Sequence, residues 1–253
     1  MSSLGLNLPA LPPALIENLG PFLFKASKNK TLLSLLLLPP VLYHLHADYL
    51  AYLSLGPGGV PHNAFGWLLS NAARLIAKET RSIAPYSPAD TDGADVGGPL
   101  ELRPRSGDRP TLGSHPLPQR QTDQLPARDI VDALKSALLE VHVNYHDRTA
   151  TGTSKLEWHG DAIFVGAAYE ARHPSSMKGE VAHLHENDGS CHVLLVRDED
   201  CVEVIEKGWG ERHGLAGVLF PKGLLLIYAP RDWEEVNVVR GIMERGVVTA
   251  LAG

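Results

Sequence analysis

The alternation of apolar and polar positions is most informative between Val181 and Val196, where the chain reads VAHLHENDGSCHVLLV. Two strand-like runs flank an Asp-Gly pair, and this combination predicts a β-hairpin. The reason is that a type I′ turn needs positive φ at both of its central residues. With Asp188 and Gly189 at those positions, His185 is expected directly opposite His192, and position 183 opposite position 194.

The two faces of the predicted hairpin differ in chemistry. Side chains alternate across a strand, so His183, His185 and His192 share one face. The other face carries only apolar residues, namely Ala182, Leu184, Cys191, Val193 and Leu195. We therefore expect one face to be buried in the core and the other to present three imidazoles as a candidate site.

Helices and strands alternate in the rest of the C-terminal half. Helical spacing predicts an amphipathic helix over 128–141, a short helix is expected over 198–207, and a long covering helix over 232–252. Asp129 is the expected N-cap of the first. Strand patterns cover 154–168 and 223–229, and the glycine-rich stretch 208–217 is expected to be a loop. Within 154–168, Lys155, Glu157 and His159 would share a face. These elements predict an α+β fold, in which helices cover an antiparallel sheet.

An apolar run dominates the N-terminal region, where residues 31–45 read TLLSLLLLPPVLYHL. Its uninterrupted part is about fourteen residues, below the roughly 20 that a spanning helix needs, and Pro39-Pro40 would kink it. Three interpretations stay open: a tilted or kinked membrane anchor that continues to Tyr52, a signal peptide, and a buried helix. Lysines at 25, 28 and 30 would place the N-terminus on the cytoplasmic side if the segment spans, whereas a monotopic anchor fixes no such side.

The region between this run and residue 127 changes from helix to proline-rich loop. Residues 48–55 should continue the helix, and 63–79 form a second, amphipathic one. Residues 82–127 contain eight prolines and are expected to be partly disordered or to wrap over the core as a lid. The piece GDRPTLGSHPLPQRQ is richer in Arg, His and Gln than a linker needs, so His115 and Arg120 are candidate site residues.

Composition narrows the function classes. The chain has 253 residues, which fits one sizeable domain or one domain with a tail. Its net charge of −6 argues against nucleic-acid binding. Its two cysteines, Cys191 and Cys201, form no CxxC pair, which excludes a zinc finger and favours a reducing compartment. Eight of the twelve histidines follow residue 140, so the candidate chemistry lies in the C-terminal part.

Three interpretations of the histidine face stay open. The rings could be a structural cluster. They could bind a metal, since the spacing resembles zinc and non-haem iron sites, although no carboxylate follows His185 at the usual distance. They could also act without a metal as general bases on an acidic enol or phenol, with Arg212 and Arg231 holding the oxyanion. Nucleophile-elbow, Walker A, dinucleotide-binding and HExxH motifs do not occur in the chain.

Several longer motifs resemble the fungal luciferase family. In chain order they are DYLAYLSLGPGGVPHNAFGW, the 107–121 piece, SKLEWHGDAIF, EVAHLHENDGSCH, GWGERHGLAG and YAPRDWEE. The resemblance extends over most of the chain from Asp48 onward. It implies oxidation of 3-hydroxyhispidin, a styryl-pyrone, by O2 without ATP or an organic cofactor, giving caffeylpyruvic acid, CO2 and light. It also implies a dry apolar wall, for which Leu194, Val196 and Trp209 are candidates.

We therefore expect two parts: an N-terminal hydrophobic anchor (1–47) and a luciferase-like α+β domain (48–253). The expected enzyme is a cofactor-independent oxygenase without a metal, bound to an internal membrane such as the endoplasmic reticulum. Its expected catalytic residues are His183, His185, His192, Arg212 and His213. Its expected substrate-binding residues are His159, Trp209, Arg231, Lys155, Tyr228, His115 and Arg120. The alternatives are a metal-dependent dioxygenase or hydrolase on the same histidines, and a non-catalytic module that binds a small phenol or lipid.

Overall fold

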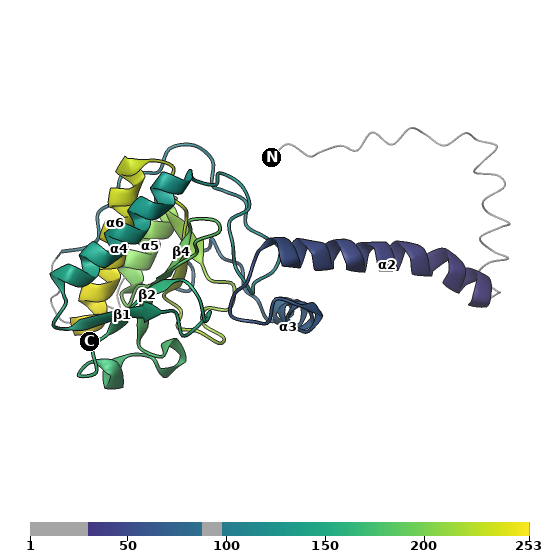
Figure 1. Ribbon diagram of the computed structural model, residues 1–253, viewed down its shortest axis with the longest axis horizontal. Helices are drawn as coiled ribbons and strands as arrows, with labels where there is room; N and C mark the ends of the chain where they lie inside the picture. Colours follow the sequence, from purple (N-terminus) through teal and green to yellow (C-terminus); the bar gives the residue numbers. More distant parts are fainter. Residues whose placement is uncertain (1–29, 88–97, 253) are drawn as a thin grey trace. The chain divides into compact units, whose positions relative to one another are not determined.

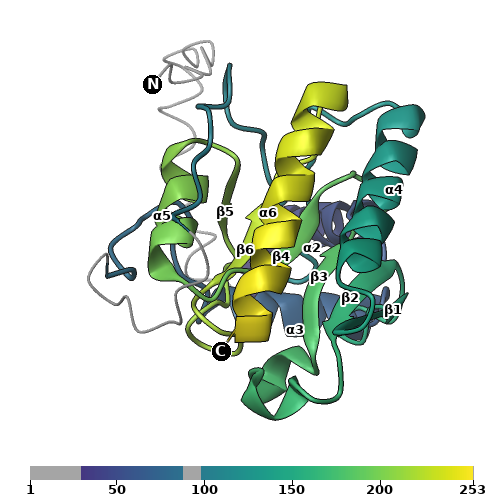
Figure 2. The same ribbon diagram turned by 90° about the vertical axis from the view of Figure 1, so that its left-hand side faces the viewer.

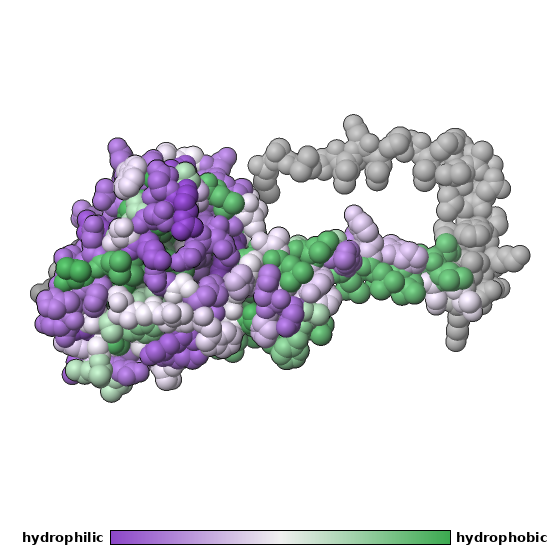
Figure 3. All heavy atoms as spheres, in the orientation of Figure 1, coloured by the Kyte–Doolittle hydropathy of each residue, from purple (hydrophilic) through white to green (hydrophobic). Residues whose placement is uncertain are grey.

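A computed structural model describes residues 30–87 and 98–252. The parts of the anchor and the proline-rich loop at 1–29 and 88–97 lie outside the described residues. The chain divides into two units, residues 1–50 and 51–253, which are considered separately. Helix α2 (Lys30–Ser54) runs as one helix (Figure 1) and contains Pro39 and Pro40. Its side chains from 35 to 38 and at 41, 42 and 45 are largely exposed, and hydrophobic surface lies along the helix (Figure 3). Within the described part of the chain, no helix has both the length and the apolarity to cross a bilayer.

The second unit contains a six-stranded sheet in the order β1-β2-β3-β4-β6-β5, with every neighbouring pair antiparallel. The strands are β1 (Thr149–Thr153), β2 (Asp161–Val165), β3 (Glu180–Leu184), β4 (Cys191–Leu194), β5 (Gly210–Arg212) and β6 (Leu224–Ile227). The predicted α+β class, with an antiparallel sheet in the C-terminal half, is confirmed.

Helices cover one face of this sheet. Helices α4 (Arg128–Asn144) and α6 (Trp233–Ala252) lie side by side on it, and α5 (Asp198–Glu206) packs beside β5 (Figure 2). The main hydrophobic core fills the space between them, and all five apolar hairpin residues predicted for burial belong to it. The remaining helices of the described part are α3 (Ala64–Arg74) and the short 3-10 turns η1 (Glu170–Arg172) and η2 (Ser175–Met177).

Irregular segments cover the other face. Residues 119–121 contact His192 in β4, Glu157 in the turn between β1 and β2, and Asp188 in the loop between β3 and β4. Leu112 forms an isolated bridge with Gln121. A small apolar cluster of Met177, Leu194, Ala216 and Leu224 lies apart from the main core. The histidine face is therefore enclosed by loops rather than by helices.

Four local predictions are wrong. Residues 154–160 form turns, and only 161–165 of the expected strand is β2; strand β1 was not predicted. Residues 210–212 form strand β5 within the expected loop, because they complete the edge of the sheet beside β6. Helix α4 begins after Ala127, and Asp129 lies in its first turn without capping it. Helix α3 ends at Arg74 rather than at residue 79.

Candidate active site

The hairpin that carries the histidines has a register different from the predicted one. His183 pairs with His192 and Ala182 with Val193, while the N–H of His185 donates to the carbonyl of Ser190 over 2.9 Å. The expected two-residue turn is replaced by a longer loop, 186–189, in which Gly189 alone has positive φ, at 73°. The register moves by two positions, an even number, so each side chain keeps its face.

The three rings therefore gather on one face, as predicted. Their centroids are 5.1 Å apart for His183 and His185, 5.0 Å for His183 and His192, and 4.7 Å for His185 and His192. All three residues are buried, with at most 3% of their surface exposed. The cluster thus lies inside the protein and away from bulk water.

A β-bulge in β3 adds a carboxylate to the cluster. Ala182 pairs with Ile163 and Glu180 with Phe164, so Val181 is an extra residue in the strand. Residues three apart normally lie on opposite faces, but the bulge turns Glu180 onto the face of His183. The buried Glu180 carboxylate lies 2.5 Å from Nδ1 of His183 and accepts hydrogen bonds from the Ser154 hydroxyl and the Lys155 N–H.

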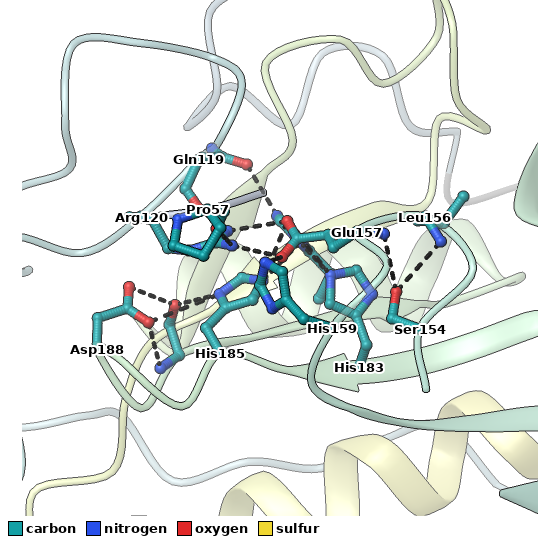
Figure 4. A network of polar contacts seen from close by, with 12 residues as sticks. Pro57, Gln119, Arg120, Ser154, Leu156, Glu157, His159, His183, His185 and Asp188 are labelled. Carbon is teal, nitrogen blue, oxygen red and sulfur yellow. Dashed lines mark hydrogen bonds and ion pairs between the residues drawn. The ribbon is translucent and has the colours of Figure 1, made fainter. Parts of the chain in front are cut away.

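A second carboxylate, Glu157, comes from the turn segment 154–160. Ser154 Oγ accepts the N–H groups of Leu156 and Glu157, and Gly160 closes the turn with φ of 76°. A Cβ on Gly160 would come 2.5 Å from the carbonyl oxygen of Leu184, so this close approach to the hairpin requires glycine. The turn directs Glu157 toward the histidines (Figure 4).

Arg120 fixes the Glu157 carboxylate from the opposite side. Its guanidinium donates to both carboxylate oxygens and also to the carbonyls of Gln119 and Pro57. The two side chains are almost fully buried. Such a planar bidentate pair is the arrangement for which arginine is suited. Arg120, predicted as a substrate-binding residue, thus lies within the site.

His185 and His192 each have a partner on the side away from the cluster. Nδ1 of His185 lies 2.8 Å from Ser190 Oγ, which donates to Asp188. Nε2 of His192 lies 3.3 Å from Oε1 of Gln119, whose amide nitrogen donates to the carbonyl of Arg212. These outer contacts fix the orientation of both rings.

Burial and charge set the protonation of the group. Burial alone would lower the pKa of His183, but its contacts with Glu157 and Glu180 outweigh burial and raise the pKa to about 9. Burial lowers the pKa of His185 and His192 well below the ordinary value, with Arg120 adding to the effect at His185. For Glu157, burial is outweighed by His185, Arg120 and His183, so its pKa falls.

Two further predicted residues lie at the edge of this group. The His213 ring is 5.0 Å from that of His192, and its Nδ1 accepts the N–H of Leu215. Burial lowers the pKa of His213 to about 3. His159 is half-buried, with its Nε2 3.8 Å from Glu157. His115 lies farther out, near Ser70, and lines a cavity of about 210 Å³ that also borders Gln119.

The two arginines expected to hold an oxyanion do not reach the histidines. Arg212 pairs with Leu225 on the core face of β5, and its guanidinium donates to the carbonyl of Glu79. Only its backbone touches the site, through Gln119. Arg231 pairs with Glu235 at the start of α6. Both placements correct the prediction. Arg212 lies in a strand that was not predicted, and side-chain alternation turns it toward the core face. Arg231 lies at the start of α6, where its ion pair with Glu235 holds it.

Three other predicted contacts also lie elsewhere. Trp209 is in the main core, where its indole N–H donates to the carbonyl of Arg103. The Tyr228 hydroxyl donates to Glu211. The Lys155 ammonium donates to the carbonyl of Lys178 and lies over the Phe164 ring, so only its backbone serves the site. Of the candidate wall residues, Leu194 is buried in the small cluster and Val196 is about half exposed.

Sequence reasoning did not select four residues that complete the site: Glu157, Glu180, Gln119 and Ser190. Alternation along 154–168 placed Glu157 on the same face as His159, and this was the one sequence feature that could have indicated a site role for any of the four. Glu180 was hidden by the bulge, which reverses the alternation. In the structure, Glu157, His183, His185 and His192 form a group whose ligand-type atoms all lie within 4.8 Å of one another.

Fold and site together define an α+β protein with a buried histidine–carboxylate centre on the loop-covered face of its sheet. Comparison with known proteins agrees with the sequence motifs. A family model described as "Luciferase domain" matches residues 178–246. Luciferases of Armillaria ostoyae and Armillaria mellea are each 33% identical over 219 residues, covering 81% of this chain and 80% of theirs. The luciferase of Neonothopanus nambi is 31% identical over 218 residues, 80% of each chain.

The chain belongs to the fungal luciferase family. No solved structure matches it. The matched 178–246 segment contains the whole histidine hairpin, so the family relationship and the buried centre concern the same part of the molecule.

Proposed function

We propose that this chain is a luciferase-like oxygenase that oxidises a hydroxylated styryl-pyrone of the 3-hydroxyhispidin type with O2. The products are CO2, a keto acid of the caffeylpyruvic type and light. Kinship with proteins named luciferase carries the proposal. The buried centre supports it, because oxidation of an acidic enol needs a proton acceptor in a place where water is excluded.

The proposed reaction balances without an organic cofactor. The enol loses its proton, and the electron-rich ring carbon forms a C–O bond with O2 to give a peroxide. The outer peroxide oxygen then bonds to the lactone carbonyl carbon, and the ring C–O bond breaks, so that the ring oxygen leaves as an enolate that takes up the proton lost in the first step. The O–O bond and the C–C bond to the former lactone carbonyl then break together, which releases CO2 and leaves the keto acid. Both atoms of O2 are retained in the products, and the substrate supplies the electrons.

The protonation of the site suits the first step. Burial lowers the pKa values of His185 and His192, so their rings are neutral at pH 7 and each has a lone pair for the enol proton, although the same burial makes them weaker bases. His213 accepts a backbone N–H at Nδ1, so its neutral ring carries its proton on Nε2 and is a donor for a substrate oxygen. Leu194, Met177 and Leu224 supply an apolar surface on the same side of the sheet.

Gln119 is the proposed entry point. It lines the cavity of about 210 Å³ and touches His192 from the other side. Pockets for small ligands usually measure about 300–1,000 Å³. We therefore expect the loop around Gln119 to shift when the substrate enters, which is the lid role considered for the proline-rich segment.

We also propose that the N-terminal segment attaches the protein to an internal membrane, such as the endoplasmic reticulum. The support is the hydrophobic surface along α2 (Figure 3), to which the exposed side chains of Leu38 and Leu42 belong. A helix lying in the interface places such side chains among the lipids without spanning the bilayer.

The test combines purified full-length protein with 3-hydroxyhispidin in air-saturated and in O2-depleted buffer. Pyrone consumption, CO2 release and photons are measured together. We expect O2-dependent consumption, and His192→Gln should reduce its rate by roughly 10²-fold or more. The exposed His146→Gln is the matched control and should leave the rate unchanged. Tight binding of the pyrone without consumption would overturn the proposal in favour of a binding module.

A further inference from the structure

The ring protons of the three histidines point away from the centre of the cluster. Nδ1 of His183 faces the Glu180 carboxylate, which only accepts. The Ser190 hydroxyl gives its proton to Asp188, so it must accept from Nδ1 of His185. The amide nitrogen of Gln119 donates to a carbonyl, so its oxygen accepts from Nε2 of His192.

The inner nitrogens of the neutral rings consequently carry lone pairs. Nδ1 of His192 lies 3.1 Å from Nε2 of His183 and 3.2 Å from Nε2 of His185. Oε1 of Glu157, another acceptor, lies 3.7 Å and 3.8 Å from these two Nε2 atoms. Four electron-rich atoms thus face one another in a water-excluded space. A proton added to Nε2 of His183 would make a hydrogen bond to Nδ1 of His192. The contact between His185 and His192 would still join two lone pairs with no proton between them.

The charges around the cluster also favour a bound cation. Glu157, Glu180 and Asp188 are buried carboxylates, and the one buried guanidinium that contacts this group in the described structure is Arg120. The three carboxylates therefore outnumber the positive charges around them, whether Arg120 is counted alone or together with a protonated His183. Buried charge of this kind requires a counter-charge. A divalent cation would supply it.

We propose that His183, His185, His192 and Glu157 bind a divalent first-row transition-metal ion. Ligand atoms about 2.1 Å from such an ion lie roughly 3.0–3.4 Å from each other. Four of the atom pairs here are 3.1–3.8 Å apart, and all four atoms lie within 4.8 Å of one another. Three imidazoles and one carboxylate suit zinc, iron, manganese or cobalt better than calcium or magnesium.

The outer contacts are also those of a metal site. Histidine ligands typically donate their other N–H to an oxygen acceptor, such as a carboxylate, a backbone carbonyl or water, which fixes the tautomer and the ring orientation. The acceptors here are Glu180 for His183, Ser190 for His185 and Gln119 for His192. The carboxylate missing near the hairpin in the sequence is supplied by Glu157 from the 154–160 turn. This inference departs from the expected metal-free site and changes one step of the proposed reaction: with an ion bound, the inner nitrogens of His185 and His192 are ligands and do not accept the enol proton.

The first experiment uses full-length protein stripped with a chelator and then titrated with Co²⁺ or Zn²⁺ alone. We expect one ion per chain by elemental analysis, d–d absorption bands for Co²⁺, and a melting temperature that rises with metal concentration. Failure to bind one equivalent of any of Zn²⁺, Co²⁺, Fe²⁺ or Mn²⁺ would overturn the proposal. The four side chains would then be held together by shared protons and not by a metal ion.

The variants locate the site. Glu157→Gln and His192→Gln should each weaken Co²⁺ binding by at least 100-fold, and Ser190→Ala by roughly 10–100-fold through the outer contact. His213→Gln is the matched control, since His213 is equally buried beside the cluster but is not one of the four ligands; it should bind Co²⁺ within about threefold of the wild type. Circular dichroism checks folding.

The two proposals fail independently. Equal loss of binding in His213→Gln, or unchanged binding in folded Glu157→Gln, would overturn the assignment of the ligands. If a variant does not fold, the titration of the wild type still decides the matter. Metal bound without pyrone turnover would overturn only the proposed function, and turnover by protein that binds no metal would overturn only this inference.

Discussion

Arg120 is the residue on which the polarity of the site depends. It keeps Glu157 ionised inside the protein and joins the proline-rich segment to the turn at 154–160. Its fourth contact, with the carbonyl of Pro57, brings in the chain that follows α2. A charge this deeply buried is stable only while its partner and the remaining hydrogen bonds are present.

Arg120→Lys should therefore be costly even though the charge is kept. A lysine ammonium cannot form the bidentate contact with Glu157 and also reach both carbonyls. We predict a loss of about 2–4 kcal/mol in the free energy of unfolding, measured by urea denaturation. Arg128→Lys is the control: Arg128 pairs with Asp132 on the surface, with 74% of its side chain exposed, and should change stability by less than about 0.5 kcal/mol. Equal effects would mean that the bidentate geometry contributes nothing.

At this scale the sequence predicted the histidines and missed their partners. Side-chain alternation depends only on local backbone geometry, so it placed His183, His185 and His192 on one face even with the wrong register. Glu157 reaches them only because a turn directs it there. Arg212 faces the other side of the sheet because it lies in a strand, β5, which the glycine-rich sequence around it did not indicate. Such placements depend on tertiary contacts, which periodicity does not encode.

Among the elements, the start of α6 holds the proline-rich segment in place. Asp232 caps the helix by accepting the N–H of Glu235. The Glu235 carboxylate accepts from Arg105 in the proline-rich segment and from Arg231 beside it. Arg105 is nearly fully buried and also donates to the carbonyl of Ala229. A segment without regular structure is thereby anchored.

Glu235→Gln should release this anchor in a pH-dependent way. Burial alone would raise the pKa of Glu235, but Arg231 and Arg105 outweigh it and lower the pKa to about 2. A carboxyl whose pKa is lower in the folded state stabilises the protein fully above its unfolded pKa, about 4.3, and loses that effect as the pH falls through the folded value. The wild type should therefore exceed the variant in stability at pH 6, and the difference should shrink between about pH 4 and pH 2.

Denaturant titrations at pH 6, 4 and 2.5 measure that difference. Glu234→Gln is the matched control, because Glu234 is the adjacent residue and its ion pair with Arg103 is exposed on both sides. Its effect should stay within about 1 kcal/mol at every pH. A stability difference for Glu235→Gln that does not vary with pH would show that its ionisation is not coupled to folding.

Element by element, long patterns were predicted better than short ones. Burial of one face gives a helix an apolar stripe, and burial of both faces gives a strand a continuous apolar run. These patterns made it possible to predict helices α4, α5 and α6 and strand β6. Strand β1 was missed because its residues TATGT are mostly exposed and carry no apolar pattern. The β3 bulge and the 186–189 loop follow from packing against β2 and Pro126, whose ring lies 2.5 Å from where a Cβ on Gly189 would be.

The centre is assembled from the whole second unit. Pro57, residues 119–121, the turn at 154–160 and the β3–β4 hairpin each supply one part of it. No single stretch of the sequence therefore displays the site, which explains why the family motifs are spread over most of the chain. The membrane proposal, in contrast, depends on the first unit alone.

Leu38→Glu combined with Leu42→Glu tests that proposal in the full-length protein. Both leucines are 53% exposed and one helical turn apart on α2. Each leucine buried in lipid contributes about 1.5–3 kcal/mol, so the pair should reduce co-sedimentation with phosphatidylcholine vesicles by more than tenfold. Leu139→Glu with Val143→Glu, the same spacing at exposed positions of α4, is the control and should co-sediment as the wild type does. Equal co-sedimentation of both pairs would show that α2 does not bind the membrane.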